Sequence, residues 1–203
     1  MKTKSTVLAL VVCAIGLTGC AKEPTDLVEA SKSAFESAKS AQASTYAQDA
    51  YTQAEISMKK MQVELEVQEK KFPLFRKYDV AVQAANEAKM AAENAVTEAE
   101  AGKAEMKSEV TDLLDQTRQA LTELQVTIAA APQGKDSAAD LKMIQADVQG
   151  IETTLAQVDQ SLSGGQYKDA LSRAQAANRL TQEIQAELQA AMNAQAQAMP
   201  SGR

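Results

Sequence analysis

The sequence predicts an all-α protein, an elongated antiparallel helical bundle or coiled coil of about five helices. Alanine, glutamine, glutamate and lysine dominate its 203 residues, and all four are compatible with helices. Apolar residues recur at alternating steps of three and four positions, the spacing that gathers them on one face of a helix. The four prolines and eight glycines fall mostly at the ends of these periodic segments, which leaves little of the chain for strands.

Two helices are expected before Pro73, over residues 26–43 and 45–71. Asp26 and Thr45 each have a glutamate or glutamine three positions later, the spacing of a capping box at a helix start. No glycine or proline marks the break between the two segments, so one continuous helix over both is the open alternative. The apolar face of the second segment comprises Ala47, Tyr51, Ala54, Met58, Met61, Leu65, Gln68 and Phe72.

A long third helix is expected over residues 74–131, because Pro73 lacks the amide hydrogen that would continue the second helix. Its first half has an alanine face, which lets helices approach closely but buries little area per contact. Its second half is aliphatic, and Gly102 at the changeover is expected to kink or weaken the helix. The two faces comprise Ala81, Ala85, Ala88, Ala92, Ala95 and Ala99, then Met106, Val110, Leu113, Leu121, Leu124 and Ile128.

Two further helices are expected after the break around Pro132, over residues 136–162 and 166–198. Ser163-Gly164-Gly165 separates them, because glycine readily adopts the backbone conformation of a helix C-terminus. Residues 199–203 are expected to form a frayed tail. The two apolar faces comprise Leu141, Ile144, Val148, Ile151, Leu155, Val158 and Leu162, then Tyr167, Ala170, Ala174, Ala177, Ile184, Leu188 and Ala191.

The connections between these helices are short, which makes consecutive helices antiparallel neighbours. We therefore expect two three-helix units that share the long third helix. The first two helices pack on its alanine half in an N-terminal, alanine-rich unit over residues 26–101. The last two pack on its aliphatic half in a C-terminal bundle over residues 102–198.

The N-terminus has the order of a secretory signal peptide, with charge first, an apolar run next and small residues last. Lys2 and Lys4 precede the apolar run, which is too short to span a bilayer as a helix. The last residues of this segment, Leu17-Thr18-Gly19-Cys20, resemble the lipobox of bacterial lipoproteins. An ordinary signal peptide with a coincidental cysteine is the alternative.

The resemblance to bacterial lipoproteins implies a signal peptide of residues 1–19, cleavage before Cys20 and a lipidated linker of residues 20–25. It further implies a diacylglyceryl thioether on Cys20 and acylation of its new amine, for example by palmitate. Several acyl chains on one residue give stable anchoring. Ala21 stands where an aspartate retains such proteins at the inner membrane, which implies an outer-membrane anchor facing the periplasm. Cys13 leaves with the signal, so no internal disulfide is expected.

A further pattern begins in the second helix. The run Tyr46-Ala47-Gln48-Asp49-Ala50-Tyr51 is followed by Ala54-Glu55 and later by Lys77-Tyr78-Asp79-x-Ala81. With these residues the segment 44–95 resembles an uncharacterised family of alanine-rich bacterial envelope proteins, many of which are lipoproteins. Gln48 stands where that family usually has a proline. The resemblance implies a helical envelope protein and brings no established activity with it.

The composition argues against catalysis and against nucleic-acid binding. The chain has no histidine, the usual general base and metal ligand, and no glycine-rich phosphate loop. Its formal net charge of −6 opposes binding to nucleic acid. Acidic residues such as Glu93, Glu98 and Glu100 lie on an alanine-rich helix and are interpreted as a solvated face. We therefore expect no enzyme, and no catalytic residue, cofactor site or metal site.

One segment, residues 70–78, departs from this background with four cations and three aromatic residues in an acidic, aromatic-poor chain. Two interpretations are open: a hairpin whose aromatic residues cover the core, and a docking tip for an anionic or amphipathic partner. If the first two helices are antiparallel, the segment returns to the membrane surface, where basic and aromatic groups suit the headgroup zone. The candidate residues are Lys70, Lys71, Phe72, Phe75, Arg76, Lys77 and Tyr78.

The expected function is that of a non-enzymatic, lipid-anchored scaffold or adaptor of the cell envelope. Its membrane contact is the lipid on Cys20, and its helix faces contact envelope proteins or peptidoglycan. The alternative is a periplasmic chaperone or carrier of apolar ligands, with an adaptable groove lined by Met58, Met61, Met90 and Met106. Self-association is a third expectation, because an apolar face left uncovered within the chain favours coiled-coil oligomers.

Overall fold

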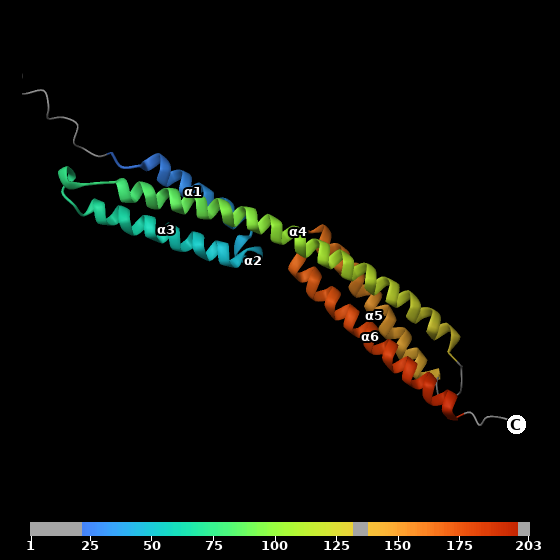
Figure 1. Ribbon diagram of the computed structural model, residues 1–203. Coiled ribbons are helices and arrows are strands. Elements are labelled where there is room, and N and C mark those ends of the chain that lie inside the picture. Colours follow the sequence, from blue (N-terminus) through green and yellow to red (C-terminus); the bar gives the residue numbers. More distant parts are fainter. Residues whose placement is uncertain (1–21, 132–137, 199–203) are drawn as a thin grey trace, which may run out of the picture. The chain divides into compact units, whose positions relative to one another are not determined.

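The computed structural model describes residues 22–131 and 138–198, and these residues form helices and turns with no strand among them. The predicted all-α fold is therefore confirmed (Figure 1). The predicted signal peptide with Cys20, the break at residues 132–137 and the tail at residues 199–203 lie outside the described residues.

The chain divides into two compact units, Met1–Gly102 and Lys103–Arg203. The long helix α4 belongs to both units. Within the described residues there are six α-helices and one 3-10 helix, η1, against the five helices expected, because the turn after α1 contains the short helix α2. In chain order they are α1 (Thr25–Ser40), α2 (Ala43–Tyr46), α3 (Gln48–Glu69), η1 (Pro73–Phe75), α4 (Asp79–Ala130), α5 (Ala138–Ser163) and α6 (Tyr167–Ala198).

In the first unit, α1 and α3 pack on the alanine face of α4, as predicted (Figure 1). Because alanine is small, the helix backbones approach closely. The buried Ser31 hydroxyl on α1 lies 2.7 Å from the Leu27 carbonyl oxygen and 2.8 Å from the Ala85 carbonyl oxygen of α4, and these two acceptors share its one hydrogen. The six alanines of the predicted face are all fully buried: Ala81, Ala85, Ala88, Ala92, Ala95 and Ala99.

A break separates α1 from α3, so the continuous-helix alternative is wrong. Gln42 has a φ of 58°, in the left-handed region, which turns the chain out of α1. Neither predicted capping box forms. Thr45 lies inside α2, α3 begins at Gln48, and the N-cap of α1 is Pro24 with no side-chain cap. Asp26 instead lies in the first turn of α1, where a negative charge favours the positive end of the helix dipole.

The third predicted helix begins later than expected, at Asp79 rather than at residue 74. Pro73 opens η1, and Arg76 after it is extended, with a φ of −71° and a ψ of 132°. From Asp79, α4 continues without a break through Gly102 to Ala130. The glycine therefore does not end the helix. It makes room for the Tyr46 carbonyl oxygen, which an added Cβ would approach to 2.4 Å.

The second unit has an aliphatic core between the rest of α4, α5 and α6. Polar groups at its edges join the helices in pairs. The Gln185 side-chain amide of α6 donates to the Ala120 carbonyl oxygen of α4 at 2.9 Å, and Arg118 of α4 pairs with Asp159 of α5 at 2.6 Å. The largest buried members of the core are Val110, Leu114, Leu121, Leu124, Ile128, Val148, Ile151, Leu155, Val158, Ile184 and Leu188.

A carboxylate in the first turn of α6, next to the connection from α5, has a lowered pKa. Arg173 and the Ser161 hydroxyl both donate hydrogen bonds to the Asp169 carboxylate, each at 2.8 Å. These bonds favour the ionised form and hold the pKa of Asp169 below its ordinary value of 3.8. Since the folded-state pKa is the lower one, this group stabilises the fold above its unfolded-state pKa. That contribution is lost as the pH falls through the folded-state pKa.

We therefore expect Asp169→Asn to lower the melting temperature at neutral pH, and the difference from the unchanged protein to shrink on acidification. Thermal unfolding followed by circular dichroism across that pH range measures both effects. Asp112→Asn, on the exposed face of α4, is the control with the same change in charge. A difference for Asp169→Asn that stays constant with pH would contradict the prediction.

Candidate functional site

The connection between α3 and α4, residues 70–77, which we call the tip, carries three exposed large apolar side chains. Phe72 is 64% exposed, Leu74 65% and Phe75 72%. The two phenylalanine rings have centroids 6.3 Å apart. Neither ring covers the core, so the hairpin interpretation is wrong for these two residues and holds only for Tyr78. Phe72 was predicted on the apolar face of the second helix, but it lies outside that helix because α3 ends at Glu69.

Two side chains hold the backbone of the tip. The Arg76 guanidinium donates from Nε to the Lys71 carbonyl oxygen at 3.1 Å and from Nη2 to the Glu69 carbonyl oxygen at 2.9 Å. These carbonyls lie at the C-terminal end of α3, where helical partners run out. The buried Gln68 side chain accepts at Oε1 from the Lys77 backbone amide at 3.0 Å and from the Lys71 ammonium at 3.1 Å. The tip is thus tied down at both of its ends.

The predicted docking residues of the tip take different positions. Lys70, Lys71 and Lys77 are exposed. Arg76 is half-buried, and its guanidinium binds backbone carbonyls rather than solvent groups. Tyr78 is only 5% exposed, because it lies inside the bundle just before α4 begins. The inclusion of Tyr78 among the docking residues is therefore corrected, and it is not part of the candidate surface.

Sequence reasoning overlooked two residues of this site. Leu74 was expected in the third helix, although it stands in η1 with its side chain in solvent. Gln68 was expected as one more member of an apolar face, yet its amide organises the tip. A polar residue at a buried position needs hydrogen-bond partners, and that requirement was the available signal.

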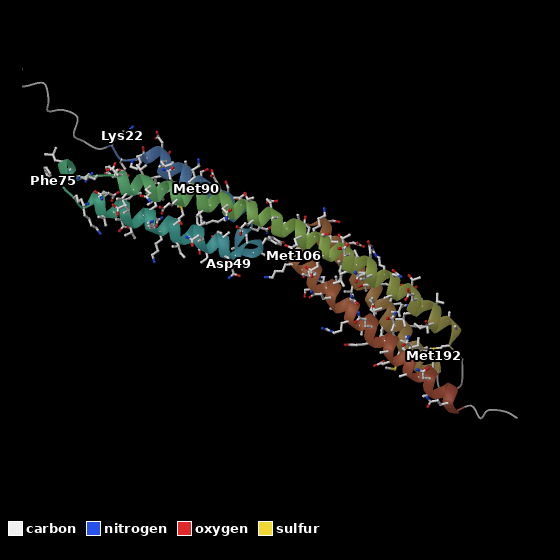
Figure 2. All side chains as sticks on the ribbon, viewed as in Figure 1. Lys22, Asp49, Phe75, Met90, Met106 and Met192 are labelled. Atoms are coloured by element: carbon white, nitrogen blue, oxygen red, sulfur yellow. The ribbon has the colours of Figure 1, made fainter. Side chains whose placement is uncertain are left out.

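The tip lies at the end of the first unit where α1 begins. Figure 2 labels Lys22, just before α1, and Phe75 at this same end. The packing agrees, because Val28 near the start of α1 shares a core cluster with Met61 of α3 and Ala84 of α4. Helices α1 and α3 therefore run antiparallel, and the chain returns at the tip to the end from which α1 starts.

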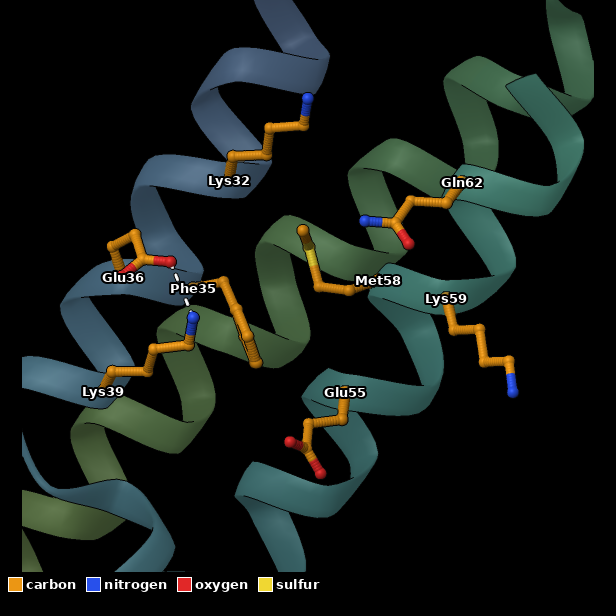
Figure 3. Close-up of a pocket in the computed structure, with 8 residues that line it drawn as sticks. All are labelled: Lys32, Phe35, Glu36, Lys39, Glu55, Met58, Lys59 and Gln62. Carbon is orange, nitrogen blue, oxygen red and sulfur yellow. Dashed lines mark hydrogen bonds and ion pairs between the residues drawn. The ribbon is translucent and has the colours of Figure 1, made fainter. Parts of the chain in front are cut away.

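A second candidate site is a groove of about 550 Å³ between α1 and α3 (Figure 3). The Phe35 and Met58 side chains extend into it, and Phe35 stacks on Tyr51 with ring centroids 5.4 Å apart. The Lys39 ammonium lies 2.7 Å from the Glu36 carboxylate and 4.8 Å from the centre of the Phe35 ring. The hydrogen bond to Glu36 raises the pKa of Lys39 above its ordinary value.

The methionines expected to line a carrier groove do not gather there. Of the four, Met58 alone borders the groove between α1 and α3. Met61 is fully buried in the core, and Met90 is 68% exposed on α4. Met106 is half-buried on the part of α4 that belongs to the second unit.

The described part of the chain contains no group of three cysteine, aspartate or glutamate side chains placed to hold a metal ion. In that same part, no helix is both long enough and apolar enough to cross a bilayer. No protein-family model matches the chain, and neither the curated proteins nor the solved structures include a match to it. The lipoprotein assignment, the envelope location and the resemblance over residues 44–95 stay predictions.

Proposed function

We propose that this protein is a lipid-anchored, non-enzymatic helical scaffold or adaptor of the bacterial cell envelope. The lipid on Cys20 attaches it to the outer membrane on the periplasmic side, and its helix faces contact envelope proteins or peptidoglycan. The observation that carries the proposal is that α1 begins at the same end of the first unit as the exposed tip. The lipid anchor and the tip can then contact the same membrane surface, and α1 extends away from that surface.

Chain length supports this arrangement. Cys20 precedes the first residue of α1, Thr25, by five positions, so the linker spans at most about 18 Å when fully extended. The 16 residues of α1 then rise about 24 Å from that point. The far end of the first unit therefore stands clear of the headgroups, where its surface is open to partners in the periplasm.

The chemistry of the groove between α1 and α3 favours a scaffold over a carrier of apolar ligands. Sites for apolar ligands are lined mostly by apolar and aromatic side chains. Here five of the eight lining residues are charged, and only Phe35 and Met58 are apolar. We expect the groove to bind no hydrophobic dye, so that Met58→Glu leaves the dye fluorescence of the folded protein unchanged. Strong dye binding that Met58→Glu abolishes would favour the carrier instead.

Lipid attachment is tested by replacing each cysteine in turn. With the full chain expressed in a Gram-negative host, Cys20→Ala is expected to abolish labelling by an alkyne fatty acid. It should also remove the protein from the outer-membrane fraction. Cys13→Ala, a matched control within the apolar run of the signal, is expected to change neither. Labelling that survives in Cys20→Ala, or a mature N-terminus other than Cys20, would overturn the anchor.

The adaptor role is tested by photo-crosslinking in intact cells. Met143 on α5 and Val126 on α4 are exposed apolar residues of the second unit, at 68% and 65%, and accept a photoreactive residue without loss of core packing. We expect a discrete adduct with an envelope protein or with peptidoglycan. If the only adducts are with a second copy of the chain, the adaptor proposal is wrong and the protein self-assembles.

A further inference from the structure

The tip concentrates exposed apolar surface in a short stretch of the chain. Phe72, Leu74 and Phe75 present three large side chains within four residues at the apex of a connection. Burying side chains of this size away from water is worth about 1.5–3 kcal/mol each. The first unit leaves that stabilisation unused, because none of the three packs in its core clusters.

The exposure follows from the construction of the tip. Arg76 holds the carbonyls of Glu69 and Lys71, and Gln68 holds the amide of Lys77, so the backbone is fixed on both sides of η1. Within η1, the Phe75 amide donates to the Phe72 carbonyl oxygen at 2.8 Å. The apolar side chains therefore point away from the bundle. Because the backbone that carries them is already fixed, binding a partner does not have to pay the entropy of ordering it.

Cations surround these apolar groups. Lys70, Lys71 and Lys77 are exposed, and no acidic residue interrupts the segment from 70 to 78. The Lys70 side chain is 80% exposed, and its ammonium lies 4.0 Å from the Glu66 carboxylate. Apolar side chains beside lysines match a phospholipid leaflet, because apolar groups enter the acyl boundary while ammonium groups meet anionic headgroups.

The position of the tip selects the same kind of partner. It lies at the end of the first unit where α1 begins, and the linker to Cys20 is short. A protein partner for three convex apolar side chains would need a pocket of its own. A leaflet is already present if Cys20 carries lipid. The tip and the start of α1 would then face that leaflet together.

We propose that the tip is a second membrane contact, which inserts Phe72, Leu74 and Phe75 into an anionic phospholipid leaflet while Lys70, Lys71 and Lys77 bind its phosphates. The proposal rests on the lipid anchor only for the identity of the leaflet. A lipid on Cys20 alone does not fix which end of the first unit faces the membrane. A second contact at the tip fixes which end of that unit faces the membrane.

Tryptophan fluorescence tests the insertion, because the chain has no tryptophan of its own. Phe75→Trp and Met90→Trp are matched probes, since the two side chains are 72% and 68% exposed in the same unit. With the lipidated protein in vesicles of phosphatidylcholine and phosphatidylglycerol, we expect Phe75→Trp to shift to the blue and to be quenched by brominated acyl chains. Met90→Trp is expected to keep the emission of a solvated indole. Equal emission and equal quenching at the two positions would overturn the proposal.

Vesicle flotation of the mature chain without lipid tests whether the lysines of the tip contribute to membrane binding. Changing Lys70→Glu with Lys71→Glu is expected to weaken binding to the same vesicles by at least about tenfold. High salt should weaken vesicle binding by the unchanged protein to a similar extent. Lys107→Glu with Lys168→Glu, both in the second unit, makes the same change in charge and should have little effect. Equal losses for the two double variants would reject headgroup binding by the tip.

The two proposals fail separately. The mass of the mature protein reports the lipid on Cys20, whereas the probe at residue 75 reports insertion. An unlipidated protein whose tip still binds vesicles would remove the anchor and keep the membrane contact. A photo-crosslinker at Phe75 that captures a discrete protein in cells, and no lipid, would replace the leaflet by a protein partner and overturn the inference.

Discussion

Replacing Gly102 with alanine is expected to destabilise the first unit by about 1–3 kcal/mol, although alanine is the better helix former by about 1 kcal/mol. An added Cβ would lie 2.4 Å from the Tyr46 carbonyl oxygen and 3.3 Å from its carbonyl carbon. The obstacle is backbone, so no side chain can rotate away to relieve it. Either α2 or α4 must move.

Movement of α2 is costly because its position is fixed on both sides. Gln42 turns into it with a φ of 58°, and its carbonyl oxygen accepts from the Thr45 amide at 2.8 Å. Ala43 is fully buried in the core cluster that α2 shares with α1, α3 and α4. A shift large enough to admit a methyl group would open that cluster.

Gly150 provides the matched control for Gly102. It is also a helical glycine, on α5, and an added Cβ there meets nothing within 4 Å. Gly150→Ala is therefore expected to stabilise the second unit by up to about 1 kcal/mol. Hydrogen exchange in the folded protein measures each unit through its own amides, and the loss in Gly102→Ala should be confined to the first unit. A gain in stability in both variants would show that α2 can move to admit the added methyl group at no cost in free energy.

The helices and their buried faces could be predicted because periodicity is a local property. The alanine face of α4 is an example: its spacing in the sequence already fixes which side of the helix is apolar, and all six alanines are buried. The aliphatic face of the second unit follows the same logic. When the apolar residues lie on one side of a helix, that side is buried by packing, regardless of which neighbouring helix covers it.

The errors occur where a residue acts through a neighbour distant in sequence. Gly102 was expected to kink or weaken the helix, and its close approach to the Tyr46 carbonyl oxygen, 56 residues earlier, was not foreseen. Thr45 has the spacing of a cap, but the left-handed turn at Gln42 starts a helix before it. Arg76 was grouped with the docking cations, although its guanidinium binds the carbonyl oxygens of Glu69 and Lys71 at the end of α3. Such pairings depend on how the chain folds back, which local spacing does not encode.

The tip was found from composition, and its internal organisation was not. A cluster of cations and aromatic residues in an acidic chain stands out without any structure. Which of those side chains face solvent depends on where α3 ends and α4 begins, and both boundaries differ from the expected ones. A shift of a few residues in a helix boundary was enough to expose Phe72 and Leu74 and to bury Tyr78.

Met61→Ala is expected to destabilise the first unit by about 2–5 kcal/mol, the range for removing a large buried side chain. Met61 is fully buried and is the largest fully buried side chain of the described residues. Its cluster includes Ala84, Ala85 and Ala88 of α4. The alanines on the α4 side are too short to fill the vacated space, so the cavity stays open unless Val28, Met58 or Leu65 moves into it or the helices approach further.

The controls for Met61 separate volume from chemistry. Met90→Ala removes the same atoms from a side chain that is 68% exposed, and should change the free energy of unfolding by less than about 0.5 kcal/mol. Met61→Leu keeps most of the volume and should cost less than about 1.5 kcal/mol. Hydrogen exchange of the first-unit amides measures all three variants. If Met61→Ala costs no more than Met61→Leu, the helices close over the cavity. The alanine face would then act as an adjustable surface, along which the neighbouring helices can move closer when a buried side chain is shortened.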